Sequence, residues 1–405
     1  MNANSMLILA DGKLHPDGRS AGQLSKAAPP RRIVVISSLT TSLVNFRLEL
    51  LKSMVAAGHT VTATGPEDDP KTKAILAEIG VRFVCVRMSR VGLNPFADLK
   101  TLFALVRLFR RLQPDLVLPY TMKPIIYGGL AARLAGVTSR CFLVTGLGHV
   151  FSCAAQATVK GRLVHRLSIR LYRYAFSGAR VIFAYNRADA ADLVDNALLG
   201  ARTALKLVPG TGVDLDRYAF CKPRSDKAVF LLVARLLKDK GINEFVEAAR
   251  LVKKTFPDAE FRLLGHFEPN PGAGIAPDDI RRWTEEGTIT YLGTTDDVRP
   301  NLTDCNVFVL PSYYREGIPR SILEAMSVGR AIITTALPGC RDTIEEGRNG
   351  ILIEPRSASA LAEAMVEMAG DLPRTQRMGE ASREIAESKF DVHAVNKILM
   401  ESMDI

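Results

Sequence analysis

Short apolar runs rich in β-branched residues alternate with amphipathic stretches along the chain from Ile33 onward. This alternation is typical of βαβ units, in which helices connect parallel strands. It is interrupted once, at residues 209–216, where glycine and proline break both periods. Because 405 residues exceed what one hydrophobic core usually supports, we predict an α/β protein with two Rossmann-like domains that join at this segment.

The same pattern predicts the individual elements. In the first domain we expect strands at residues 33–37, 60–64, 115–120, 140–145 and 180–185, and helices at 45–57, 99–112, 125–134 and 162–176. In the second domain we expect strands at residues 229–233, 260–264, 288–292, 307–310, 331–334 and 350–353. The predicted organisation is a flexible leader at 1–30, an N-terminal domain at 31–210, a C-terminal domain at 211–390, and a helix at 391–405 that returns towards the N-terminal domain.

Composition and motifs exclude several classes of protein. No stretch approaches the roughly 18 apolar residues that span a bilayer, and the apolar run at residues 6–10 is too short for a secretory signal. The six cysteines are scattered singly, and no histidine cluster has metal-ligand spacing, so we expect a cytoplasmic protein with no metal site and no cofactor. The glycine patterns of dinucleotide oxidoreductases and P-loop ATPases are absent.

Charge is distributed unevenly along the chain. The net charge of +10 combines +16 in residues 1–210 with −6 in the remainder. A basic half favours a polyanionic partner, either nucleic acid or an anionic lipid surface. Residues 159–176 form a basic stretch without an acidic residue, and its arginines are Arg162, Arg166, Arg170 and Arg173. Such a helix can lie on a membrane, but it can equally be an ordinary helix with one buried and one solvated face.

The most informative segment is residues 316–329, which follows an apolar strand. Pro319 fits the first turn of a helix and Gly329 its end, so we predict a helix over residues 319–328. The free N–H groups at its amino end suit a diphosphate. Glu316 precedes the helix, and Glu324 lies five residues past Pro319, about 7 Å further along. The two carboxylates can hold sugar and ribose hydroxyls, although a helix charge partner and a solvated residue are the plainer interpretations.

A second element follows the strand predicted at 229–233. It places Arg235 at the carboxyl end of the strand and Lys240 in the loop before the next helix. A guanidinium and an ammonium there can hold two phosphates and neutralise a leaving diphosphate. Seen alone, either residue is as well explained as a surface cation in a polar loop.

Together these motifs resemble glycosyltransferase family 4, a retaining group with the GT-B fold, over nearly the whole chain from Ile33. Glu316 and Glu324 match its Glu-x7-Glu signature, and Arg235 with Lys240 matches its phosphate motif. The resemblance implies that Glu316, Arg235 and Lys240 are catalytic and that Glu324 binds the donor's ribose. It also implies further donor contacts from Gly265, Gly317, Ile318 and Pro319, and no metal in the site.

The first half resembles the branch that builds lipid-linked bacterial glycans, including undecaprenyl-diphosphate α-1,3-N-acetylgalactosaminyltransferases. Candidate residues for the acceptor or the cleft rim follow its strands, and these are Ser38, Asn45, Arg47, Tyr120, Lys123, Thr145 and His149. Many relatives carry a histidine where we align Thr145. His149 lies four residues later, so it is either a catalytic or a structural imidazole.

The leading hypothesis is therefore a retaining glycosyltransferase that moves a sugar, from a UDP-sugar, to a polyprenyl-diphosphate glycan in cell-surface polysaccharide or glycoprotein glycan synthesis. We expect it on the inner face of the cytoplasmic membrane, held by anionic lipid. One alternative is a nucleotide-sugar 2-epimerase of the same architecture. A non-catalytic nucleic-acid-binding protein is the other, but no recognition helix or aromatic-rich basic patch supports it, and no nucleic acid partner is expected.

Overall fold

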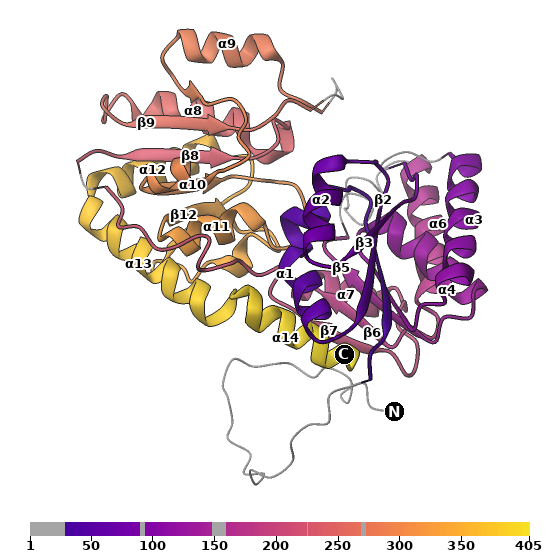
Figure 1. Ribbon diagram of the computed structural model, residues 1–405. Coiled ribbons are helices and arrows are strands. Elements are labelled where there is room, and N and C mark those ends of the chain that lie inside the picture. The colour runs from indigo at the N-terminus through magenta and orange to yellow at the C-terminus, as the bar shows by residue number, and fades with distance from the viewer. Residues whose placement is uncertain (1–28, 90–93, 148–158, 225, 269–272) are drawn as a thin grey trace, which may run out of the picture. The chain divides into compact units, whose positions relative to one another are not determined.

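The computed structural model describes residues 29–89, 94–147, 159–224, 226–268 and 273–405 (Figure 1). It divides into two compact units. Unit 1 comprises Met1–Thr211 together with His393–Ile405, and unit 2 comprises Gly212–Val392. Apart from residues 29 and 30, the segment predicted as a leader lies outside the described residues.

Unit 1 is built on a seven-stranded parallel sheet with the order β3-β2-β1-β4-β5-β6-β7. Its strands are β1 (Arg32–Ile36), β2 (Thr60–Gly65), β3 (Arg82–Cys85), β4 (Leu116–Pro119), β5 (Ser139–Val144), β6 (Val181–Ala184) and β7 (Ala204–Leu207). Its helices are α1 (Ser42–Ala56), α2 (Pro70–Glu78), α3 (Pro95–Leu112), α4 (Gly129–Leu134), α6 (Val159–Phe176), α7 (Arg187–Asp195) and α14 (Val392–Met403), and a π-helical turn, η1 (Pro124–Gly128), leads into α4. Helices α3, α4 and α6 pack together over one face of this sheet (Figure 1).

Unit 2 repeats the plan with six parallel strands in the order β10-β9-β8-β11-β12-β13. These are β8 (Val229–Val233), β9 (Glu260–Leu264), β10 (Thr290–Tyr291), β11 (Val307–Leu310), β12 (Ala331–Thr335) and β13 (Gly350–Ile353). Its helices are α8 (Ile242–Val252), α9 (Pro277–Glu285), α10 (Arg299–Thr303), α11 (Arg320–Val328), α12 (Ala358–Gly370) and α13 (Leu372–Lys389), with 3-10 turns η3 (Lys238–Lys240) and η4 (Arg341–Thr343). Helices α8 and α12 pack on one another and on the main core, and α13 packs on α11 and β12.

The predicted fold class of two parallel α/β domains is confirmed, and the predicted bounds of β8, β9, β11 and β13 are those observed. Strands β3 and β7 were not predicted. Both lie at edges of the sheet and are only partly buried, so their sequences lack the continuous apolar run of a central strand. The helix predicted at 125–134 is a π-helical turn followed by the short α4, a distinction that hydrophobic periodicity does not make.

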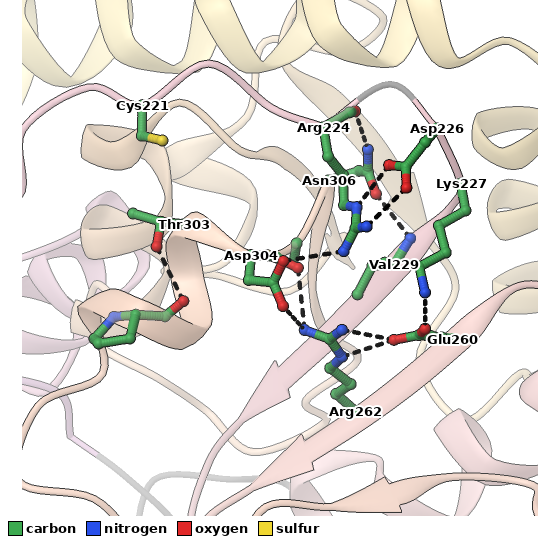
Figure 2. Close-up of polar contacts among 12 residues, drawn as sticks. Cys221, Arg224, Asp226, Lys227, Val229, Glu260, Arg262, Thr303, Asp304 and Asn306 are labelled. Carbon is green, nitrogen blue, oxygen red and sulfur yellow. Dashed lines mark hydrogen bonds and ion pairs between the residues drawn. The ribbon is translucent and has the colours of Figure 1, made fainter.

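Paired charges lie at the amino ends of β8, β9 and β11 in unit 2 (Figure 2). Arg262 of β9 donates to Glu260 at 2.6 Å and to Asp304 at 2.6 Å, and Arg224 donates to Asp304 at 3.0 Å. Asn306 donates to the carbonyl of Arg224 at 2.5 Å. These groups satisfy one another, and the predicted phosphate ligands Arg235 and Lys240 lie at the opposite, carboxyl edge of the sheet.

The chain passes between the units twice, and the two segments of unit 2 next to these crossings are hydrogen-bonded to each other. The Val213 amide donates to the Phe390 carbonyl at 2.7 Å, and the Val392 amide donates to the Val213 carbonyl at 3.0 Å. Gly212 has φ +67°, and a Cβ at this position would lie 2.6 Å from Val392 Cα. Only glycine allows the two segments to approach this closely.

Replacing Gly212 by alanine should therefore lower the thermal midpoint, because the new Cβ forces the two segments apart. We expect a loss of about 5 to 10 °C for Gly212→Ala, measured by differential scanning calorimetry. Gly58→Ala is the matched control, since Gly58 also has positive φ but has open space where a Cβ would lie. It should cost only about 2 to 4 °C. Equal losses would show that close approach at Gly212 is unimportant.

Candidate functional site

The strand order of unit 2 reverses between β8 and β11. In open α/β sheets, ligands bind beyond the carboxyl ends of the strands at such a reversal, because the two loops there diverge to opposite faces. Arg235 and Lys240 follow β8, and Glu316 follows β11. The fold therefore brings the two predicted phosphate ligands and the first glutamate of the signature to one edge of the sheet.

Lys240 and Glu316 form an ion pair at this edge. Their side chains are only 13% and 14% exposed. Ser312 donates to the same carboxylate oxygen at 3.0 Å, and the Lys240 ammonium lies 5.4 Å from the centre of the Tyr314 ring. Removing one partner of such a pair leaves a poorly solvated charge, so each group holds the other in position until a ligand supplies a new partner.

The two loops that carry this pair are interlocked. The amides of Tyr313 and Tyr314 donate to the Asp239 carbonyl at 2.9 and 3.2 Å. Gly241 has φ +75°, and a Cβ there would lie 2.2 Å from the Pro311 carbonyl oxygen. A glycine directly after Lys240 is thus required for the loop after β8 to pack against the end of β11.

Arg235 is paired as well. It donates to Glu268 at 2.9 Å, and its side chain is 37% exposed. Glu268 comes from the loop after β9, the neighbour of β8 in the sheet. Sequence reasoning missed this carboxylate because nothing in its local pattern marks it, and its proximity to Arg235 follows only from the pairing of β8 with β9.

Helix α11 begins one residue later than predicted. Pro319 is its N-cap, with an extended ψ of 118°, and therefore does not occupy the first turn. The predicted stop is confirmed, since Gly329 ends the helix with φ +88°. Within the described part of the chain, the amides of Gly317, Ile318 and Ser321 donate to no other group. Three backbone donors are thus available beside Glu316, where the positive end of the helix dipole also lies.

Glu324 is held from two sides. Its Oε1 atom accepts from the Tyr218 hydroxyl at 2.9 Å and from Arg320 Nε at 3.1 Å, and its side chain is 15% exposed. Burial raises the pKa of Glu324, and the Arg320 charge and the Tyr218 hydrogen bond oppose that rise. The sequence carried a signal for Arg320, which lies one helical turn before Glu324. It carried none for Tyr218, which is 106 residues away.

Gly265 directly follows β9. Its amide donates to the Gly293 carbonyl at 2.9 Å, and its own carbonyl accepts from the Tyr291 hydroxyl at 2.8 Å. A Cβ at this position would lie 1.7 Å from the Ala234 carbonyl oxygen. The loops after β8, β9 and β10 are therefore in close contact around Gly265, at the same edge as Arg235.

In unit 1 the strand order reverses between β1 and β4, and the predicted residues Ser38 and Tyr120 each bond there to a neighbouring hydroxyl. Ser38 shares a hydrogen bond of 2.7 Å with Thr121, and the Tyr120 hydroxyl shares one of 2.7 Å with Ser42. Arg47 is 3% exposed, donates to the Tyr185 hydroxyl at 2.7 Å and stacks on the Tyr120 ring. The structure therefore gives Tyr120 and Arg47 internal partners in the core of unit 1.

The remaining candidates of unit 1 lie apart. Lys123 is buried and donates to Asp98 at 2.8 Å and to Ser89 at 2.7 Å, which ties the start of α3 to η1. Asn45 is exposed on α1, and Thr145 follows β5 with its side chain partly exposed. His149 lies outside the described residues. The four arginines Arg162, Arg166, Arg170 and Arg173 are all exposed on α6.

Two family models match the chain, one for each unit. Residues 44–209 match the family described as "Glycosyl transferase 4-like domain", and residues 227–371 match "Glycosyl transferases group 1". The chain belongs to the glycosyltransferases. The two matches occur in the same order as units 1 and 2, so this glycosyltransferase carries both halves of the architecture that the motifs of residues 235–240 and 316–324 led us to expect.

Two relatives of this glycosyltransferase are named as α-1,3-glycosyltransferases with acceptors linked to diphospho-undecaprenol. It is 28% identical to an N,N'-diacetylbacillosaminyl-diphospho-undecaprenol α-1,3-N-acetylgalactosaminyltransferase from Campylobacter jejuni, over 82% of this chain and 88% of the relative. It is 27% identical to a UDP-Gal:α-D-GlcNAc-diphosphoundecaprenol α-1,3-galactosyltransferase from Escherichia coli, over 75% and 79%. The structure of HepE from Anabaena in complex with UDP aligns with a TM-score of 0.73 at 18% identity, over 92% of this chain and 99% of HepE, which confirms the GT-B fold.

Among the residues that the structure describes, no group of three or more histidine, cysteine, aspartate or glutamate side chains is arranged to hold a metal ion. Among the same residues, every helix is too short or too polar to cross a bilayer.

Glu268 is the ion-pair partner of Arg235. Neutralising Glu268 should therefore release Arg235 and strengthen the binding of a diphosphate. We expect Glu268→Gln to raise the affinity for inorganic pyrophosphate about two- to fivefold, since a partly exposed ion pair contributes about 0.2 to 1 kcal/mol. Isothermal titration calorimetry measures this, and Glu363→Gln, an exposed change of the same charge on α12, is the control. A weaker affinity in Glu268→Gln would mean that Glu268 itself contacts the ligand or supports the site.

Proposed function

We propose that this glycosyltransferase transfers a sugar, with retention of anomeric configuration, from a UDP-sugar to a glycan linked to a polyprenyl diphosphate. The observation that carries the proposal is the Lys240–Glu316 pair beside the available amides of Gly317 and Ile318, at the strand reversal of unit 2. One small region thus offers a cation, a carboxylate and backbone donors. A sugar linked to a diphosphate needs all three.

In this proposal the diphosphate lies between the two cations and the start of α11. Lys240 and Arg235 exchange their carboxylate partners for phosphate oxygens, and the amides of Gly317 and Ile318 donate to the same group. Glu316, released from Lys240, accepts from hydroxyls of the donor sugar. Charge-assisted contacts of this kind stabilise the negative charge that develops on the leaving diphosphate. They would do so without a metal ion.

Retention follows if the acceptor attacks from the face that the diphosphate leaves. The bond between the anomeric carbon and the phosphate oxygen breaks, and the acceptor oxygen forms the new bond on the same side. The leaving phosphate oxygen takes the acceptor's proton. Glu316 orients the sugar in this scheme and forms no covalent intermediate.

The substrates are proposed from the relatives. The N-acetylgalactosaminyl- and galactosyltransferases reported above act on undecaprenyl-diphosphate glycans by name, and the second uses UDP-galactose. Solved neighbours hold UDP, and one of them UDP-glucose. Both family models and both relatives carry glycosyltransferase names, so they give the 2-epimerase alternative no support.

A lipid-linked acceptor requires contact with a membrane, and one surface of unit 1 suits that role. Of the fourteen exposed large apolar side chains in the described part of the chain, eight lie on α3, α4 and α6, which pack side by side. On α3 these include Phe96 and Phe103, and on α6 Leu163 and Leu167. Exposed basic residues alternate with them, namely Lys100, Arg107, Arg110, Arg111, Arg162, Arg166, Arg170 and Arg173. Apolar and basic groups together favour an anionic lipid surface.

The donor reaction is tested with a panel of nucleotide sugars, with release of nucleoside diphosphate as the readout, in the presence and absence of a polyprenyl-diphosphate glycan. We expect release from a UDP-sugar that depends on the acceptor. Glu316→Gln should lower turnover at least a hundredfold, because the sugar loses its orienting carboxylate. Arg235→Ala and Lys240→Ala should each lower kcat/KM ten- to a hundredfold or more.

Thermal midpoints of the three variants, compared with wild type, separate loss of chemistry from loss of fold. If Glu316→Gln retains activity within about threefold of wild type, Glu316 has no part in the reaction. EDTA should leave the rate unchanged, and a strict requirement for added Mg²⁺ or Mn²⁺ would contradict the proposed roles of Arg235 and Lys240.

Membrane contact is tested by sedimentation with vesicles. Arg173 donates to the Asn196 carbonyl at 3.0 Å, so the charge reversal is restricted to Arg162, Arg166 and Arg170. Each basic residue near an anionic leaflet contributes roughly 1 kcal/mol, and salt screens this within about 10 Å at 0.1 M. We therefore expect wild type to bind vesicles containing anionic lipid, to bind more weakly as salt rises, and to lose binding when the three arginines become glutamate.

The control reverses three exposed basic residues of unit 2, Lys254, Arg341 and Arg377, and should bind vesicles like wild type. If the α6 variant sediments with anionic vesicles as wild type does, α6 is an ordinary solvated helix and takes no part in membrane contact.

A further inference from the structure

Glu324 is connected by hydrogen bonds to the segment with which unit 2 begins. Tyr218 ends a turn in which its amide donates to the Asp214 carbonyl at 3.0 Å. The Tyr218 carbonyl accepts from the Ser327 hydroxyl at 2.7 Å and from Arg383 at 3.1 Å. The backbone of Tyr218 is therefore fixed by α11 and by α13, and this fixes the hydroxyl that reaches Glu324.

The two oxygens of Glu324 are used differently. Oε1 accepts from both Tyr218 and Arg320, which is as many donors as its two lone pairs take. No donor in the described residues contacts Oε2. A carboxylate that is mostly buried and has one oxygen saturated and one available is suited to accept from a hydroxyl of defined position.

The two donors, Tyr218 and Arg320, also affect the pKa of Glu324. Burial raises the pKa of Glu324, whereas Arg320, Tyr218 and, more weakly, Arg217 lower it. Without these donors a larger fraction of Glu324 would carry a proton at a given pH. A protonated carboxyl offers fewer acceptor sites to a hydroxyl.

We propose that Tyr218 and Arg320 are positioning residues for the ribose of the donor: they occupy Oε1 of Glu324 and leave Oε2 to accept from the vicinal ribose hydroxyls. This inference rests on the proposed donor role of Glu324. Neither Tyr218 nor Arg320 need touch the donor. Their contribution is to the orientation and the charge of the carboxylate that does.

The test compares UDP with 2',3'-dideoxy-UDP, which lacks both ribose hydroxyls, by isothermal titration calorimetry. Wild type should prefer UDP, and Glu324→Ala should abolish the preference. Tyr218→Phe should weaken UDP binding about three- to tenfold and leave the binding of the dideoxy compound unchanged. In the double variant with Glu324→Ala, the change at Tyr218 should have no further effect. Tyr172→Phe, a buried tyrosine of unit 1, is the control and should bind both compounds like wild type.

Measuring the two affinities over a range of pH distinguishes positioning from a purely structural role, because a structural role would not change their pH dependence. The ratio of UDP to dideoxy-UDP affinity should fall as Glu324 becomes protonated, and the fall should occur at higher pH in Tyr218→Phe and Arg320→Gln than in wild type. Taking the ratio cancels the titration of the phosphate, which both compounds share.

The outcomes separate the two proposals. If Glu324→Ala keeps the preference for UDP, the donor role of Glu324 is wrong and the inference falls with it. If Glu324→Ala abolishes the preference but Tyr218→Phe retains it at every pH, only the positioning role is overturned. Equal losses for UDP and the dideoxy compound in Tyr218→Phe would also overturn it, because they indicate a general disturbance of unit 2.

Discussion

The Lys240–Glu316 ion pair of the candidate site depends on one topological constraint, the reversal of strand order in an all-parallel sheet. The loops that follow β8 and β11 lie next to each other at this reversal. The two strands begin 78 residues apart in the chain, so only the sheet brings their loops together. The ion pair of Lys240 and Glu316 connects these two loops, and Gly241 allows them to pack closely because it lies against Pro311. Without the reversal Lys240 would not meet the Glu316 carboxylate of the loop after β11.

The charges of this site form two ion pairs, which the proposed function requires to exchange partners. Two cations and two carboxylates pair as Lys240 with Glu316 and Arg235 with Glu268, so neither cation lacks a counter-ion. In the proposed reaction an incoming diphosphate brings its own negative charge and competes with both carboxylates. The free energy of binding is then the difference between the contacts with the diphosphate and the ion pairs that it replaces, and this limits affinity. The same ion pairs keep the site ordered before the ligand arrives.

Sequence alone gave the central strands and the motif residues, because burial imposes continuous apolar runs on β8, β9 and β11 and because glycine and proline mark the ends of α11. It could not give Glu268 or Tyr218, whose partners are 33 and 106 residues away and whose local patterns are unremarkable. In unit 1 residue type was a weaker guide. Arg47 and Lys123 follow the pattern of ligand-binding cations, yet tertiary packing gives both of them buried internal partners.

Unit 1 is discontinuous, since its last segment, His393–Ile405, is separated from the rest by the whole of unit 2. Arg180, which directly precedes β6, forms an ion pair with Asp404 of that segment. On the ribosome, at about 5 to 20 residues per second, the intervening chain takes on the order of 10 to 40 s to synthesise. Unit 2 can therefore fold while unit 1 still lacks α14, and the unit that is begun first is the one completed last.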